Sequence, residues 1–135
     1  MTVPIAVSVA GSDSSGGAGI EADLKTFSAL GVYGACIVTA VTAQNTKGVS
    51  AIHAVPADIV AAQIDAVFSD LDVGATKIGM LVNASIVEAV GAALGRRSSR
   101  NVVLDPILAA STGAELLRAD ALDALRLLIP KARVF

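Results

Sequence analysis

The sequence predicts an α/β fold in which a mainly parallel sheet is flanked by helices. Short apolar segments alternate along the chain with longer segments whose apolar residues repeat at helical spacing. The short segments are continuously apolar, which is typical of strands covered on both faces of a sheet. With 135 residues, of which 54% are hydrophobic, the chain is long enough and apolar enough to form about one folded domain.

Four segments have the length and composition of buried strands. They are Ile5–Val9, Cys36–Val41, Ala75–Ile78 and Val102–Leu104. The last residues, Ala132–Phe135, have the pattern of a further strand that begins after Pro130. Because neither a cap nor a polar tail follows, we expect the chain to be truncated within its fold, although a natural edge strand would give the same pattern.

Four segments between and after these strands predict helices. In the first, Ile20, Leu24 and Phe27 follow one another at steps of four and three, so they share one helix face. Asn83 precedes the third segment as a candidate N-cap, and Pro130 ends the fourth. The segments are Ile20–Leu30, Pro56–Leu71, Ala84–Leu94 and Ala114–Ile129.

Composition excludes several classes of function. The formal net charge of −2 argues against nonspecific nucleic-acid binding, which needs a basic surface. A single cysteine, Cys36, excludes an internal disulfide framework and a multi-cysteine metal site. Polar residues interrupt the apolar runs well before the roughly 20 residues of a membrane-spanning helix, and the N-terminus lacks a basic signal region. We therefore expect a cytoplasmic protein without a membrane partner.

A glycine-rich segment, Ala10–Gly19, joins the first predicted strand to the first predicted helix. Open α/β sheets bind ligands at such junctions, where free backbone N–H groups favour anions. The spacing from Gly11 to Gly16 resembles a phosphate-binding P-loop, but Gly17 stands where that motif needs lysine. The segment from Gly17 also fits a dinucleotide fingerprint, yet its acidic partner is missing. The alternative is a flexible connection without a ligand.

Other polar and apolar residues follow strands at the same predicted edge of the sheet. Gln44 could pair through its amide with an aminopyrimidine edge, although turn chemistry explains this segment equally well. Asp23, in the first helix, could contact a ligand or favour the helix dipole. Asp105 could hold Mg²⁺ near phosphates or cap a turn. Met80 could line an apolar pocket or fill the core.

Several of these segments together resemble the hydroxymethylpyrimidine/phosphomethylpyrimidine kinases of thiamine biosynthesis. The resemblance extends in order over essentially the whole chain. It is strongest in the first block. The matching segments are Ala10–Ile20, Ala22–Phe27, Leu30–Gly34, Thr42–Thr46, Lys77–Leu81 and Val103–Pro106.

The resemblance implies a ribokinase-like fold and ATP- and Mg²⁺-dependent phosphorylation of 4-amino-5-hydroxymethyl-2-methylpyrimidine and its monophosphate. It implies that Gln44 binds the polar edge of the pyrimidine, that Gly11 and Asp23 flank this substrate, and that Met80 packs against it. It further implies that Asp105 helps to place the metal and the phosphates.

One departure from the family pattern concerns catalysis. The second half of these kinases carries a Gly-Thr-Gly-(Cys or Asp) anion-hole motif, and this sequence has none. The resemblance therefore implies that residues 1–135 are the N-terminal half of one kinase domain. Because phosphoryl transfer depends on positioning and charge stabilisation, we expect this chain alone to be inactive or nearly so, and no catalytic residue is assigned within it.

Other functions remain open from the sequence. A related pyridoxal, vitamin or sugar kinase of the ribokinase-like superfamily would share the same strand and loop pattern. A noncatalytic pyrimidine-binding module would keep the pocket without the chemistry. A dinucleotide-dependent oxidoreductase is disfavoured because the acidic ribose partner is missing. An unpaired apolar edge at the final strand also predicts self-association, as a homo-oligomer or with another chain.

Overall fold

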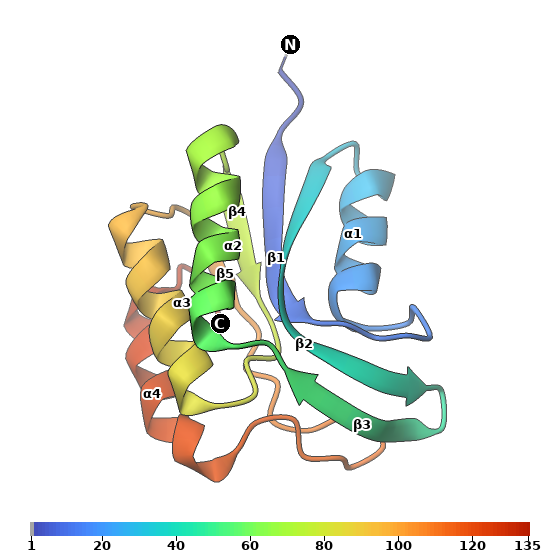
Figure 1. Ribbon diagram of the computed structural model, residues 1–135. Helices are drawn as coiled ribbons and strands as arrows, with labels where there is room; N and C mark the ends of the chain where they lie inside the picture. Colours follow the sequence, from blue (N-terminus) through green and yellow to red (C-terminus); the bar gives the residue numbers. More distant parts are fainter. Residues whose placement is uncertain (1) are drawn as a thin grey trace.

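The structure, a computed structural model, describes residues 2–135 as one five-stranded sheet with helices on both faces (Figure 1). The order of the strands across the sheet is β3-β2-β1-β4-β5. Parallel pairing joins β2 to β1, β1 to β4 and β4 to β5, which confirms a mainly parallel sheet. The strands are β1 (Ile5–Gly11), β2 (Tyr33–Asn45), β3 (Gly48–Ala54), β4 (Ala75–Ile78) and β5 (Val102–Leu104).

The helices follow the predicted segments closely except for the last. Asn83 caps α3 as expected, since its side chain accepts a hydrogen bond from the backbone N–H of Ile86 at 3.0 Å. Pro56 stands directly before α2, where its fixed φ suits the start of a helix. The helices are α1 (Gly19–Ala29), α2 (Ala57–Asp70), α3 (Ala84–Arg96) and α4 (Leu122–Leu128).

The expected helix over Ala114–Ile129 is wrong in its first part. Residues 114–118 form a loop, and a single 3-10 turn precedes the short α4. The backbone N–H of Leu116 donates to the carbonyl of Leu108, and that of Arg118 donates to the carbonyl of Val82. Both bonds satisfy the backbone without a helix, and the bond from Arg118 attaches the end of this loop to the residues that follow β4.

The strand β3 was not predicted from the sequence. It pairs antiparallel with the second half of β2, and a tight turn joins the two strands. The signal was the turn at Thr46 and Lys47, followed by Gly48 and the β-branched Val49 and Ile52. Exposed small and polar residues interrupt this strand, and they hid the pattern because an edge strand does not need to be continuously apolar.

The two faces of the sheet are covered unequally. Figure 1 shows α1 alone on one side and α2, α3 and α4 on the other. Alternate residues of β1 divide between them, because Val7 and Val9 belong to the apolar core while Ser8 bonds to Asp23 of α1. The main core therefore lies between the sheet and α2–α4. It includes Ile37, Val60, Ile64, Ile86, Val87, Val90, Leu125 and Leu128.

The sheet ends in two different edges. Residues 33–38 of β2 pair with β1 on one side and with no strand of the described chain on the other. The side chain of Gln63 covers part of this edge, since it bonds to both the N–H and the carbonyl of Val38. At the opposite edge, Val134 forms an isolated parallel bridge to Val103 of β5, but the expected strand over Ala132–Phe135 does not form. None of the described helices is long and apolar enough to cross a membrane.

Candidate functional site

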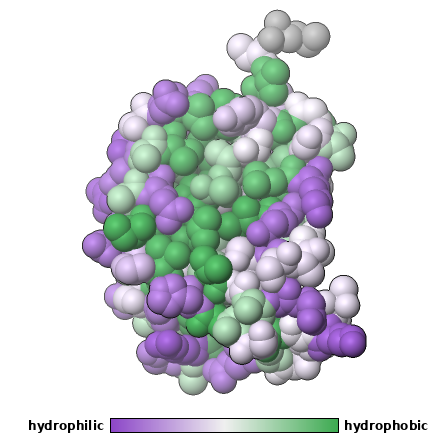
Figure 2. Space-filling model, turned by 45° about the vertical axis from the view of Figure 1, so that its right-hand side comes forward, coloured by the Kyte–Doolittle hydropathy of each residue, from purple (hydrophilic) through white to green (hydrophobic). Residues whose placement is uncertain are grey.

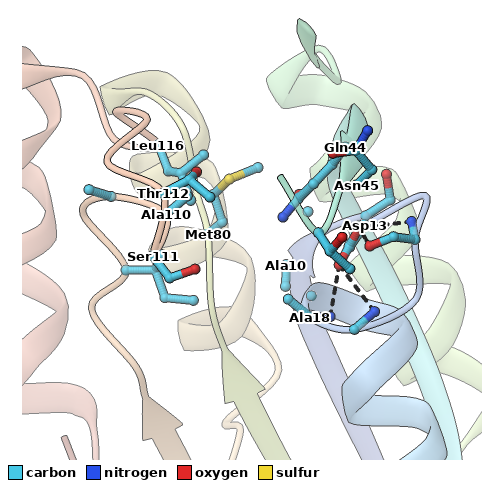
Figure 3. A pocket seen from close by; sticks show the side chains of 18 residues that line it. Ala10, Asp13, Ala18, Gln44, Asn45, Met80, Ala110, Ser111, Thr112 and Leu116 are labelled. Carbon is cyan, nitrogen blue, oxygen red and sulfur yellow. Dashed lines mark hydrogen bonds between the residues drawn. The ribbon is translucent and has the colours of Figure 1, made fainter. Parts of the chain in front are cut away.

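A cavity of about 520 Å³ lies at the carboxyl ends of β1, β2 and β4. One wall is the glycine-rich loop together with the end of β2, and the other is the segment 107–116 (Figure 3). Of the residues that the sequence marked as candidates, Gly11, Gln44 and Met80 line this cavity. The topology therefore brings together three side chains or backbone positions that are up to 69 residues apart in the sequence, as expected for the carboxyl edge of a parallel sheet.

The glycine-rich loop folds around the carboxylate of Asp13. One carboxylate oxygen accepts hydrogen bonds from the N–H and the hydroxyl of Ser15, at 2.9 and 2.7 Å. The other accepts from the N–H groups of Gly17 and Ala18, at 3.1 and 2.9 Å. The loop was expected to offer free N–H groups to an anionic ligand. In the structure, the carboxylate of Asp13 instead accepts hydrogen bonds from these N–H groups at the start of α1.

Asp13 is almost completely buried, with 3% of its surface exposed. Burial by itself raises the pKa of this carboxyl group. The hydrogen bonds from the side chain and backbone of Ser15, and from the backbone of Ala18 and Gly17, outweigh burial and lower the pKa below its ordinary value. Asp13 therefore remains an anion whose oxygens are already satisfied, so it is a poor candidate for a general base.

Two serines attach the glycine-rich loop to β2. Ser12 accepts a hydrogen bond from the backbone N–H of Thr42 at 3.0 Å, and its own N–H donates to the carbonyl of Ala40. Ser14 bonds to both backbone groups of Gln44: its hydroxyl donates to the carbonyl at 2.5 Å and accepts from the N–H at 2.8 Å. The loop thus extends the hydrogen bonding of the sheet beyond β1.

A register shift between Ala43 and Gln44 interrupts the pairing of β2 with β3. Such irregularities re-aim a side chain relative to a regular strand. Gln44 lies next to this shift and lines the cavity opposite Met80 (Figure 3). The backbone that presents the Gln44 amide is therefore set by the shift on one side and by Ser14 on the other.

Two glycines lie where the loop meets the floor of the cavity, and the stricter requirement is at Gly19. A Cβ on Gly11 would lie 2.3 Å from the methyl carbon of Met80, so the flexible end of the Met80 side chain rests on the backbone of Gly11. A Cβ on Gly19, which has φ of +58°, would lie 2.4 Å from the carbonyl oxygen of Gly11. The buried hydroxyl of Thr39, on β2, donates to the carbonyl of Met80 at 2.6 Å and holds the backbone of Met80 in place.

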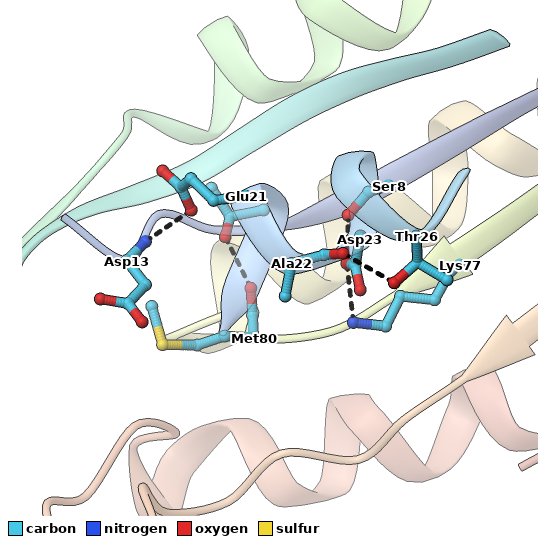
Figure 4. Close-up of polar contacts among 9 residues, drawn as sticks. Ser8, Asp13, Glu21, Ala22, Asp23, Thr26, Lys77 and Met80 are labelled. Carbon is cyan, nitrogen blue, oxygen red and sulfur yellow. Dashed lines mark hydrogen bonds and ion pairs between the residues drawn. The ribbon is translucent and has the colours of Figure 1, made fainter. Parts of the chain in front are cut away.

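Asp23 does not line the cavity. It lies on the α1 side of the sheet, where one carboxylate oxygen accepts from Ser8 at 2.6 Å and pairs with the ammonium of Lys77 at 2.9 Å (Figure 4). These contacts join α1 to β1 and β4 behind the loop. Glu21, two residues earlier, accepts from the backbone N–H of Asp13 at 2.8 Å. Carboxylates of α1 therefore anchor the loop and the sheet from behind.

Asp105 stands at the carboxyl end of β5, exposed to solvent, and its backbone N–H donates to the carbonyl of Ile78. It does not line the cavity. Among the described residues, no three His, Cys, Asp or Glu side chains gather into a metal-binding group. One accessible carboxylate fits Mg²⁺ chemistry, because this ion is commonly held by one or two carboxylates together with water and substrate phosphates.

The second wall was missed by the sequence interpretation. Its small and apolar side chains follow Pro106, and it includes the Ser111-Thr112-Gly113 turn signal that marks a loop. That signal could have placed a loop here but could not have placed it across the cavity from Gln44. The residues of this wall that line the cavity are Ile107, Ala109, Ala110, Ser111, Thr112 and Leu116.

The sheet order, the helix layers and a cavity at the carboxyl edge define a ribokinase-like α/β fold, as the resemblance implied. Residues 13–135 match the family described as phosphomethylpyrimidine kinase, and the chain belongs to this family. It is 60% identical to hydroxymethylpyrimidine/phosphomethylpyrimidine kinase of Rhizobium meliloti over 121 residues, which cover 90% of this chain and 45% of that protein.

Solved structures agree with this assignment. Phosphomethylpyrimidine kinase of Clostridium difficile superposes with a TM-score of 0.88 at 45% identity, covering 97% of this chain and 57% of that one. Pyridoxal kinase of Bacillus subtilis, solved as an ADP complex, superposes with a TM-score of 0.84 at 36% identity, covering 97% and 50%. The chain spans about half the length of the hydroxymethylpyrimidine kinases that it matches.

Proposed function

We propose that this chain supplies the substrate pocket of a kinase that phosphorylates 4-amino-5-hydroxymethyl-2-methylpyrimidine and its monophosphate in the cytoplasm. The observation that carries the proposal is the Gln44 amide facing Met80 across a cavity of about 520 Å³. Cavities of this size suit small ligands. A primary amide can both accept from an exocyclic amino group and donate to the neighbouring ring nitrogen.

The remaining lining residues suit a flat ring. The Met80 side chain offers a polarizable apolar surface, and its contact with Gly11 leaves the backbone of the loop close to the ligand. Asp23 enters the proposal as a residue that anchors α1 behind the pocket through Ser8 and Lys77. We assign no direct ring contact to it.

ATP is the proposed phosphoryl donor, since a related pyridoxal kinase of Staphylococcus aureus was solved with AMP-PCP. Asp105 is the described residue that would hold Mg²⁺, from the carboxyl end of β5. The ion would neutralise charge on the phosphates during transfer.

We expect the 135-residue chain to turn over little pyrimidine by itself. Asp13 is the single ionisable residue among those that line the cavity, and the loop already satisfies its carboxylate. The lining thus includes neither a cation for phosphate nor a free base for the hydroxyl. Phosphoryl transfer would need such groups from elsewhere. Robust turnover by the chain alone would contradict this expectation.

Isothermal titration calorimetry of the chain with 4-amino-5-hydroxymethyl-2-methylpyrimidine tests the pocket. Gln44→Leu removes both amide bonds and should weaken binding by about 2 kcal/mol, roughly 30-fold. Asn45→Ala changes the neighbouring cavity residue and serves as the matched control, with little expected effect. Unchanged affinity in Gln44→Leu would remove the basis of the proposal.

Pyridoxal phosphorylation is the second candidate, because pyridoxal kinases share this fold at up to 36% identity among the structures compared. Pyridoxal lacks an amino group beside a ring nitrogen, so it would not use the Gln44 amide in the same way. Competition between pyridoxal and the pyrimidine in the calorimeter separates the two candidates. Tighter binding of pyridoxal would favour the vitamin B6 reaction. If a longer chain carrying these residues bound pyrimidine but never phosphorylated it, a noncatalytic binding module would be favoured.

We also propose that the chain self-associates. Figure 2 shows apolar side chains gathered over the middle of the face that comes forward when the α1 side is turned toward the viewer. The exposed large apolar residues of β2 and β3 are Tyr33, Val41 and Ile52. Exposed apolar surface beside an unpaired strand favours association. A single monomeric species in equilibrium sedimentation would refute self-association.

A further inference from the structure

We propose that Thr42 is a positioning residue that determines which end of the Gln44 amide faces the cavity. Thr42 would thereby set the order of hydrogen-bond donor and acceptor that the site recognises in a ligand. This inference rests on the proposed role of Gln44 in pyrimidine binding. It concerns a residue that does not itself line the cavity.

The hydroxyl of Thr42 has two oxygen neighbours and one hydrogen to donate. The carbonyl oxygen of Ser12 lies 2.7 Å from Oγ1, and Oε1 of Gln44 lies 3.3 Å from it. Hydrogen bonds between a hydroxyl and an oxygen are most frequent near 2.7–2.8 Å and rarely exceed about 3.0 Å. The hydroxyl of Thr42 therefore donates its hydrogen to the carbonyl of Ser12. Because Thr42 is only 4% exposed, water has little access to replace this hydrogen bond.

Once its hydrogen is given to Ser12, Thr42 presents only lone pairs to Gln44. An oxygen of Gln44 at this position would face another acceptor. A half-turn of the amide about its last bond exchanges Oε1 and Nε2 and places an N–H donor against Thr42. This orientation makes the contact attractive, so the hydroxyl of Thr42 selects it.

The selected orientation leaves a defined pattern toward the cavity. Of the two hydrogens on Nε2, the one directed away from Oε1 bonds to Thr42. The other hydrogen and Oε1 remain side by side as a donor and an acceptor. This pair complements an aminopyrimidine edge, in which an amino donor adjoins a ring-nitrogen acceptor. A 4-oxopyrimidine edge has the reverse order and would require the amide to turn back.

The backbone of Gln44 supports this selection because it has little freedom to follow a turned amide. Ser14 bonds to both the N–H and the carbonyl of Gln44, and the register shift lies directly before it. The glycine-rich loop, which carries Ser14, also provides the Ser12 carbonyl. The loop thus fixes the hydrogen of Thr42 and the backbone of Gln44 together.

The test compares two ligands by calorimetry: 4-amino-5-hydroxymethyl-2-methylpyrimidine and its 4-oxo analogue. The wild-type chain should prefer the amino compound. Thr42→Val removes the hydroxyl at similar volume, so the amide can adopt either orientation and the ratio of the two affinities should fall roughly tenfold. Thr42→Ser retains the hydroxyl and should keep the ratio within about twofold of wild type.

The ratio separates positioning from a general loss of structure. A purely structural effect of Thr42→Val would weaken both ligands equally and leave the ratio unchanged, and that result would overturn the inference. A wild-type chain that binds neither pyrimidine would instead overturn the proposed function, and this inference with it. If Thr42→Val does not fold, ¹⁵N-edited NMR of the wild-type chain decides. A nuclear Overhauser contact from the Gln44 amide hydrogens to Thr42 supports the assignment, and its absence contradicts it.

Discussion

The glycine-rich loop and the segment 107–116 face each other across the cavity, but different bonds hold them. Side chains of Asp13, Ser12 and Ser14 connect the loop to itself and to β2. The opposite segment is held mainly by short-range backbone bonds, such as those from Ala110 to Ala114 and from Gly113 to Ala110. The loop is therefore preorganised by the rest of the fold, whereas the opposite wall can shift without breaking the sheet.

Two glycines with positive φ, one in each wall, provide the largest contrast. Gly19→Ala should lower the free energy of unfolding by about 3 kcal/mol, because its Cβ would collide with the carbonyl of Gly11 in a backbone conformation that is already unfavourable. Gly113 has φ of +91°, but a Cβ added there would meet no atom within 4 Å, so Gly113→Ala should lower the free energy of unfolding by only about 1 kcal/mol. Urea denaturation of both variants measures the difference. Equal losses would show that the two walls are equally constrained.

Asp13→Asn tests the anion inside the loop. The amide would place an NH₂ group where one carboxylate oxygen now accepts from Gly17 and Ala18, so we expect a loss of about 2 kcal/mol in unfolding free energy. A substitution in the other wall, Thr112→Val, is the matched control and should change stability by less than about 0.5 kcal/mol.

The Asp13 contribution should also depend on pH. Because the folded protein lowers the pKa of Asp13, stabilisation is complete above the ordinary value of 3.8 and is lost as the pH falls through the folded pKa. The stability difference between wild type and Asp13→Asn should therefore shrink at acid pH. A difference that stays constant from neutral pH down to pH values well below 3.8 would contradict the assigned ionisation.

The smallest expected effect concerns Ser14. Ser14→Ala removes two bonds to the backbone of Gln44 and should destabilise the chain by about 1 kcal/mol, while weakening pyrimidine binding through the less ordered amide. Ser111→Ala, in the opposite wall, should leave both quantities nearly unchanged. Thermal melts and calorimetry measure the two effects. Identical behaviour of the serine variants would remove the distinction between the walls.

The elements that the sequence predicted well have strong local signals. Ala75–Ile78 and Val102–Leu104 are strands with the predicted bounds, and Asn83 caps α3. Leu-rich periodicity alone was not sufficient at residues 114–118, because bonds to Leu108 and Val82 satisfied the backbone outside a helix. Local patterns succeed where burial and local capping agree, and they fail where distant partners compete for the same backbone groups.

The candidate site was predicted in part for the same reason. Gly11, Gln44 and Met80 follow strands, and parallel topology brings such positions to one edge. The ion pair between Asp23 and Lys77 joins residues 54 positions apart, and no local sequence pattern near either residue predicts it. Likewise, the sequence places Asp13 within the glycine-rich loop but could not show that its carboxylate accepts hydrogen bonds from the N–H groups of that loop.

The sequence by itself determined the four parallel strands, the first three helices, the position of the glycine-rich loop and the placement of Gly11, Gln44 and Met80 at the carboxyl edge of the sheet. These features depend on spacing and on local backbone preferences, which are written along the chain. Only the tertiary structure decided which donor meets which acceptor: Asp13 with the loop, Ser14 with the backbone of Gln44 and the segment 107–116 across the cavity. Those choices depend on distances between residues far apart in sequence, which are fixed only when the sheet has assembled.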